Sequence, residues 1–135
     1  MNNPLIMHIN YCEQGQGVDE TCRKAAAWGA DGVEFRRVSA VLKHDSRERY
    51  LDDIAESAGR HGLTHVVFGC QVNLMRADKG ERDREVAEAA EFFSSALSRF
   101  PLTVVNVMSG PLLNPDSGVP HSDYDRQGSF ISVEE

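Results

Sequence analysis

The feature of this 135-residue chain that most constrains its fold is a repeated pairing of a short apolar segment with a helix-forming segment. The apolar segments begin near residues 5, 32, 64 and 102, and each is a run of apolar residues rather than an alternation of apolar and polar ones. Such runs are typical of parallel strands covered on both faces, with helices as the connections between them. The spacing of about 30 residues is that of βα units. The sequence therefore predicts one α/β domain with a parallel sheet over residues 1–135.

The same patterns predict the individual elements. Apolar residues at helical spacing predict three helices, of which the first ends at Gly29, the second is capped by Ser46 and closes at Gly62, and the third is stopped by Pro101. The third helix is expected to bury a face made of Val86, Ala89, Ala90, Phe93, Leu97 and Phe100. The expected strands and helices cover residues 5–10, 18–28, 32–36, 46–61, 64–69, 86–100 and 102–108.

Beyond the last strand, the stretch from Ser109 to Gly128 is rich in turn-forming residues and is expected to be a polar loop. The final four residues, Ser132–Glu135, match the Ser-x-x-Glu capping box that begins a helix. They predict the start of a fourth helix, and a chance match at a chain end is the alternative.

Charge and composition exclude several classes of function. The chain has 21 acidic and 14 basic residues, a net charge of -7, and its densest basic stretch, 36–49, is interrupted by acids. We therefore expect no nucleic-acid partner, although a small anionic ligand such as a sugar phosphate stays open. No apolar run approaches the roughly 20 residues of a membrane span, and the start lacks a secretory signal. A cytoplasmic protein without a membrane segment is expected.

The three cysteines are Cys12, Cys22 and Cys70, and no two form a Cys-x-x-Cys pair. This spacing predicts neither a disulfide framework nor a structural zinc site, and it favours buried or inert thiols. The pair His61 and His65 straddles a glycine, so we do not expect it to hold a metal. Residues 121–125 carry ligand types for a hard metal, but a solvated turn is the favoured interpretation. Motifs for nucleotide binding and for serine hydrolases are absent from the sequence.

Parallel α/β folds bind ligands at the carboxyl ends of their strands, so the candidate site residues were sought there. Glu34 and Arg36 point to the same side of a strand and suit a polyol with an anionic group, with a structural ion pair as the alternative. His8 suits a general base, a substrate donor or a structural role. The predicted substrate-binding residues are His8, Glu34, Arg36, Asn106 and Ser109.

Three segments together resemble the first half of a sugar phosphate isomerase/epimerase with the xylose-isomerase-like (β/α)8 barrel, or TIM barrel. They are 30–36 (Ala-Asp-Gly-Val-Glu-Phe-Arg), the Gly62–Leu63 lead into the third strand, and the Ala-rich helix before 101–105. The resemblance covers nearly the whole chain and implies about four of the eight βα units, since a closed barrel has about 250 residues. We expect such a half-barrel fragment to be weakly active or inactive alone.

The resemblance also implies a chemistry: proton transfer at a carbon next to a sugar carbonyl through an enediol, assisted by divalent manganese, magnesium or zinc. The family's metal ligands and catalytic carboxylates lie mainly on strands five to eight, so the catalytic residues stay unknown and no metal ligand is assigned in this chain. What carries over is the pocket wall, with Glu34 matching the family's strand-two glutamate.

Three alternatives remain open. One is the metal-dependent lyase or endonuclease branch of the same superfamily, which places a histidine ligand where this chain has 108–110 (Met-Ser-Gly); that difference and the net charge count against it. The second is a non-catalytic interaction module, a half-barrel that forms a homodimer through its open sheet edges. The third is an open flavodoxin-like sheet, which requires the first strand to be central.

Overall fold

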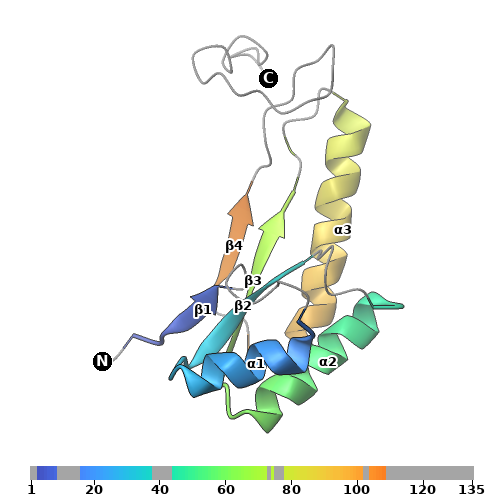
Figure 1. The fold of residues 1–135 in the computed structure, drawn as a ribbon. Helices are drawn as coiled ribbons and strands as arrows, with labels where there is room; N and C mark the ends of the chain where they lie inside the picture. Colours follow the sequence, from blue (N-terminus) through green and yellow to red (C-terminus); the bar gives the residue numbers. More distant parts are fainter. Residues whose placement is uncertain are drawn as a thin grey trace.

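The computed structural model describes residues 3–8, 16–37, 44–72, 74, 78–101 and 104–108, in which strands and helices alternate along the chain (Figure 1). The predicted polar loop from Ser109, the capping box at Ser132 and the residues 121–125 lie outside the described residues. The elements are β1 (Ile6–His8), α1 (Val18–Ala27), β2 (Gly32–Arg36), α2 (Arg47–Arg60), β3 (His65–Gln71), α3 (Lys79–Leu97) and β4 (Val105–Met108).

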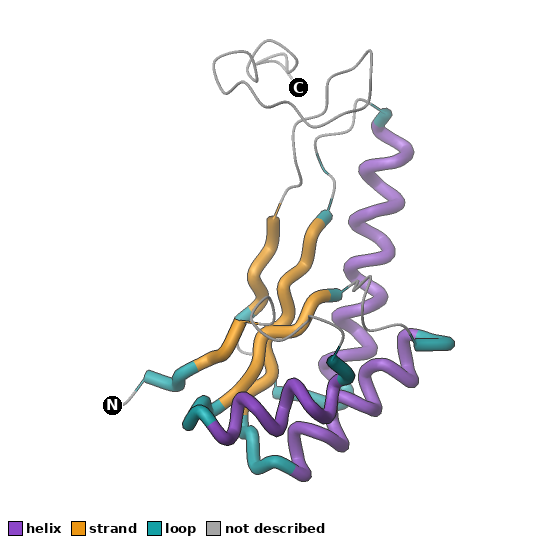
Figure 2. Tube along the Cα trace, viewed as in Figure 1, coloured by secondary structure: helices purple, strands orange, loops and turns teal. Residues whose placement is uncertain are grey.

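The strands form one parallel sheet in the order β1-β2-β3-β4, so neighbours in sequence are neighbours in space (Figure 2). This confirms the predicted parallel α/β architecture, and the consecutive order is compatible with half of a (β/α)8 barrel. The flavodoxin-like alternative is wrong, because it needs β1 in the centre of the sheet and β1 lies at an edge. Each helix connects two parallel neighbours, and every connection moves the chain one position in the same direction along the sheet.

The three helices pack against one face of the sheet and enclose the main core (Figure 1). Val33 and Phe35 point from β2 into this core and are fully buried. On β3, Phe68 meets Phe92 of α3 and Phe100 edge-on, with ring centroids 5.1 and 5.8 Å apart. Because side chains alternate along a strand, Glu34 lies on the opposite face of the sheet, which we call the open face because none of the described helices covers it.

The predicted residues Ser46, Gly29 and Gly62 lie at the ends of their helices as expected, whereas the start of α3 at Lys79 and its cap Asp78 were not predicted. The Ser46 side chain caps α2 by accepting a hydrogen bond from the Arg49 N–H at 3.1 Å, and Asp78 caps α3 by accepting from Glu81 at 2.7 Å. Gly29 and Gly62 follow α1 and α2 with φ of +79° and +71°, a conformation that glycine adopts without strain. Of the helices that the structure describes, none has the length and apolarity needed to cross a membrane.

The buried face of α3 differs from the predicted one. The helix begins at Lys79, and its buried residues are Ala89, Phe92 and Ala96, whereas Val86 and Leu97 of the predicted face are 51% and 60% exposed. The apolar residues of α3 cover a wider arc than α2 and β3 can contact, so only part of that arc is buried. Periodicity alone could not show which part the neighbouring elements cover.

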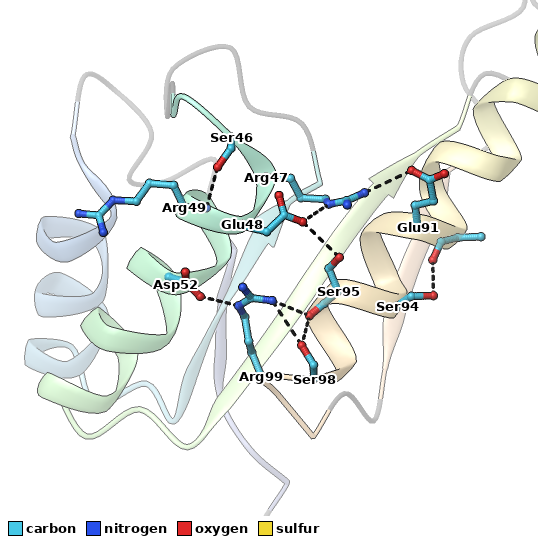
Figure 3. Close-up of polar contacts among 11 residues, drawn as sticks. Ser46, Arg47, Glu48, Arg49, Asp52, Glu91, Ser94, Ser95, Ser98 and Arg99 are labelled. Carbon is cyan, nitrogen blue, oxygen red and sulfur yellow. Dashed lines mark hydrogen bonds and ion pairs between the residues drawn. The ribbon is translucent and has the colours of Figure 1, made fainter.

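A row of polar contacts joins α2 to α3 (Figure 3). Arg99, just after α3, donates to Asp52 at 2.6 Å, and Arg47 reaches Glu91 at 3.4 Å. Ion pairs this exposed contribute little to stability, about 0 to 1 kcal/mol each.

Gly32 begins β2 at a position where the next strand leaves no space for a side chain. A Cβ atom there would lie 2.2 Å from the backbone oxygen of His65, a distance that no real contact allows. The glycine of the Gly-Val-Glu segment is therefore needed for the approach of β2 to β3. Glu34 lies two residues further along the same face of β2, so it too is held close to β3.

Candidate functional site

The candidate site is built around the Glu34 carboxylate on the open face of the sheet. The Asn106 side-chain amide, from β4, donates a hydrogen bond to Glu34 Oε1 at 3.1 Å. The Nε2 atom of His8, from β1, lies 3.9 Å from Glu34 Oε2. The structure thus brings together three of the predicted site residues from three different strands, and we call them the His8–Glu34–Asn106 row.

The row crosses β3 because Gly69 has no side chain. In the sheet register Glu34 is level with Val67 on β3, whereas Asn106 is level with Gly69, two residues further on. The Glu34 side chain therefore leans over β3 to reach Asn106, and a Cβ atom at Gly69 would lie 3.0 Å from Glu34 Oε1. Sequence reasoning missed Gly69, although a glycine inside an apolar strand is a known sign of a close approach.

The environment of the row suits hydrogen bonding to a polar ligand. The Glu34 side chain is 15% exposed and that of His8 is 40% exposed, so the carboxylate is held in place while the imidazole stays accessible. An imidazole is able to accept or donate a proton, and a protonated His8 would form an ion pair with Glu34. The arrangement is able to bind hydroxyl groups and to move a proton.

The remaining two predicted site residues are Arg36 and Ser109, and neither has a described contact with Glu34. Arg36 is half-buried two residues beyond Glu34 on the same face, and its backbone carbonyl accepts a hydrogen bond from the Tyr50 hydroxyl at 3.0 Å. A joint role of Glu34 and Arg36 in holding a polyol and an anion stays a prediction. Ser109 lies outside the described residues.

Arg37, which sequence reasoning did not single out, is held on the helix side of the sheet. Its side chain is 10% exposed and contacts the Gln71 carbonyl at 3.1 Å and Glu85 at 3.5 Å. It lines an open pocket of about 210 Å³ between α2 and α3. The other lining residues are Arg47, Tyr50, Glu88, Glu91 and Phe92. Each arginine there faces a glutamate, so we interpret this pocket as part of the helix packing.

The described cysteines are inert, as predicted. Cys22 and Cys70 are free and almost fully buried, and Cys12 lies outside the described residues. Burial raises the pKa of the Cys22 thiol to about 12 and also raises the pKa of Cys70. A thiol that stays protonated is a poor nucleophile and a poor metal ligand.

The two histidines that were not expected to hold a metal have separate partners. His61 contacts Asp19 at 3.0 Å, and His65 contacts the Thr64 hydroxyl at 2.8 Å. The hydrogen bond from His61, together with Arg60, lowers the pKa of Asp19. The contact of His61 joins α1 to the end of α2, whereas His65 is in β3 and its contact is with the residue just before that strand.

A metal centre is not assembled by the described part of the chain. No group of three or more His, Cys, Asp or Glu side chains with the geometry to hold a metal ion occurs within it. His8 and Glu34 supply at most two such ligands. The divalent metal implied by the resemblance therefore stays a prediction.

The sequence matches no protein-family model and no curated protein, and the fold matches no solved structure. A functional assignment must therefore start from the residues of the site.

Proposed function

We propose that this chain forms the first four units of a xylose-isomerase-like barrel of the sugar phosphate isomerase/epimerase family. We further propose that the open face of its sheet binds a sugar or a sugar phosphate. The observation that carries the proposal is the His8–Glu34–Asn106 row, which stands on the uncovered face of a parallel sheet of consecutive strand order. In a barrel that face becomes the interior, and its carboxyl end holds the ligand.

The residues of the row suit a polyol. The Glu34 carboxylate is able to accept hydrogen bonds from two neighbouring sugar hydroxyls, and the Asn106 amide offers both a donor and an acceptor. His8, which is more exposed than Glu34, is able to exchange a proton with the ligand. Arg36, further along the same face, would favour a phosphate group.

Isomerisation or epimerisation requires removal of a proton next to the sugar carbonyl and its return to the same or the neighbouring carbon. The described residues supply polyol recognition and one proton carrier, and they do not supply a complete set of metal ligands. We therefore expect ligand binding by the isolated chain and little or no turnover. A cytoplasmic location and a divalent metal belong to the same proposal.

The test is a binding titration followed by NMR. The purified 135-residue chain is titrated with a panel of aldoses, ketoses and their phosphates, and saturable shifts are expected at His8, Glu34 and Asn106. Glu34→Gln should weaken binding at least about tenfold, which corresponds to about 1.4 kcal/mol. The matched control is Glu56→Gln, an exposed glutamate of α2 that should leave binding unchanged. Arg36→Ala should weaken phosphates more than free sugars.

Two results would contradict the proposal. One is the absence of saturable binding by every sugar in the panel, with and without manganese. The other is equal loss of binding in Glu34→Gln and Glu56→Gln. Robust epimerisation by the isolated chain with manganese would leave the ligand class standing and would refute the expectation of an incomplete site.

The two open edges of the sheet favour a second candidate function, a non-catalytic half-barrel that acts through association. The lyase or endonuclease branch has no comparable support, because the net charge of -7 opposes binding of a polyanion. Cleavage of DNA containing an abasic site, with added zinc, is the assay that would favour that branch.

A further inference from the structure

The gap between His8 and Glu34 in the candidate site is too wide for a direct hydrogen bond. The two residues are register partners on β1 and β2, yet His8 Nε2 lies 3.9 Å from Glu34 Oε2. A nitrogen and an oxygen that share a hydrogen atom lie about 2.7 to 3.2 Å apart. The other carboxylate oxygen, Oε1, accepts the Asn106 amide at 3.1 Å. One side of the gap is therefore held in place by a contact from β4.

A single hydroxyl group fits this gap. If an oxygen atom lies about 2.8 Å from both Nε2 and Oε2, the angle between these two atoms at the oxygen is about 90°, which a hydroxyl group accommodates. An ionised carboxylate only accepts hydrogen bonds, so the intervening group must donate to Glu34 Oε2. When His8 carries a hydrogen atom on Nε2, the same group must also accept. A hydroxyl group does both at once.

Other small groups satisfy at most one side of the gap. An ether, a carbonyl or a fluorine has no hydrogen atom to donate to the carboxylate, and an ammonium group has no lone pair for the imidazole N–H. A methylene group would cover both polar atoms without bonding to either, which costs free energy. The chemistry of the two sides therefore favours a hydroxyl group over these alternatives.

The gap is accessible to a ligand. The His8 side chain is 40% exposed and the Glu34 side chain 15% exposed, and none of the described helices covers this face of the sheet. We infer that one hydroxyl group of the ligand bridges His8 and Glu34, accepting from Nε2 and donating to Oε2. The inference rests on the proposed function, which leaves open which hydroxyl group is selected. It makes His8 and Glu34 together the specificity-determining pair for one hydroxyl position.

The first experiment removes the hydroxyl groups of a sugar one at a time. The sugar that binds most tightly in the panel of aldoses, ketoses and their phosphates is compared with its monodeoxy and monofluoro analogues by titration of the full chain. At one position the deoxy analogue should bind at least about tenfold more weakly, because two hydrogen bonds are lost. The fluoro analogue at that position should bind no better, because fluorine would face the carboxylate without a hydrogen atom.

The second experiment tests whether that hydroxyl group contacts His8. In His8→Leu, the loss of affinity on removing the hydroxyl group should be at least about threefold smaller than in the native chain, because half of the bridge is already absent. The matched control is His65→Leu, which replaces a histidine that contacts the Thr64 hydroxyl at the start of β3 and should leave that loss unchanged. Circular dichroism should show that both variants are folded.

The outcomes separate this inference from the proposed function. Saturable binding of sugars with no deoxy analogue weakened refutes the bridge and leaves the proposed function standing. The bridge is also refuted if His8→Leu leaves the loss unchanged, or if His65→Leu reduces it equally. Absence of binding by every sugar refutes both. The comparison of analogues uses the native chain, so it does not depend on the folding of a variant.

Discussion

Replacing Gly69 with alanine tests whether the space above β3 organises the candidate site. The new Cβ would lie 3.0 Å from Glu34 Oε1, too close for the carboxylate to stay where it is. The carboxylate is the flexible end of a side chain, so it should move rather than disturb the sheet. That movement breaks the 3.1 Å hydrogen bond from Asn106.

The expected size of the effect follows from two opposing contributions. A hydrogen bond to a charged group contributes about 1.5 to 3 kcal/mol, and the lower value applies because Asn106 is exposed. Alanine in place of glycine offsets about 0.5 to 1 kcal/mol of this loss by restricting the unfolded chain. The free energy of unfolding in urea should therefore fall by about 1 kcal/mol or less.

The decisive signal is local and comes from NMR. The side-chain amide resonances of Asn106 should shift in Gly69→Ala, while the resonances of the helices stay unchanged. Gly59→Ala is the matched control, because a Cβ there meets nothing within 4 Å, and it should stabilise the protein by about 0.5 to 1 kcal/mol. If Gly69→Ala gives the same gain as the control and leaves the Asn106 signals in place, the reasoning is refuted.

Three further predictions concern the core, the caps and the buried thiol, and a fourth concerns acid stability. Phe68→Ala should lower the free energy of unfolding by about 3 to 5 kcal/mol, because it removes the ring that two other phenylalanines pack against; a loss below about 1 kcal/mol in urea would contradict this. Ser46→Ala should cost about 1 kcal/mol, whereas Ser46→Asn, which keeps a capping oxygen, should cost less in the same measurement. With the other two cysteines changed to serine, Cys22 should resist a thiol reagent at pH 8 until the protein unfolds, and rapid native labelling would disprove its burial. The pKa of Asp19 is lowered in the folded protein, so its carboxylate stabilises the fold above pH 3.8, the ordinary pKa of the group. This stabilisation is lost as the pH falls through the lowered pKa, and acid titrations should therefore show a shallower loss of stability in Asp19→Asn.

The sequence predicts the elements of this fold well because local chemistry determines them. Strand β2 occupies the predicted residues 32–36, and Ser46 and Gly62 mark the ends of α2 as expected. The strands are apolar runs in the sequence, and α2 and α3 are preceded by Ser46 and Asp78, whose side chains cap them. The strand order did not follow from these patterns, because a flavodoxin-like sheet also places a helix after each strand and has its first strand in the centre.

The candidate site was predicted in its chemistry and not in its geometry. Glu34, His8 and Asn106 were chosen because each stands near a strand end, and no local pattern shows that one carboxylate reaches across an intervening strand. That reach depends on Gly69, a residue whose role is to be small. The covered face of α3 was missed for a similar reason, because burial there depends on which neighbours are present.

The Glu34 side chain extends across β3 to Asn106, so the hydrogen bond between these two residues also reports the register of the strands. Side chains alternate between the two faces, so a slip of β4 by one residue would turn Asn106 toward the helices and put a valine on the open face. The contact at Glu34 forms only when β2, β3 and β4 are all correctly aligned. The Asn106 amide signal would therefore report misaligned sheets that circular dichroism cannot distinguish from the native fold.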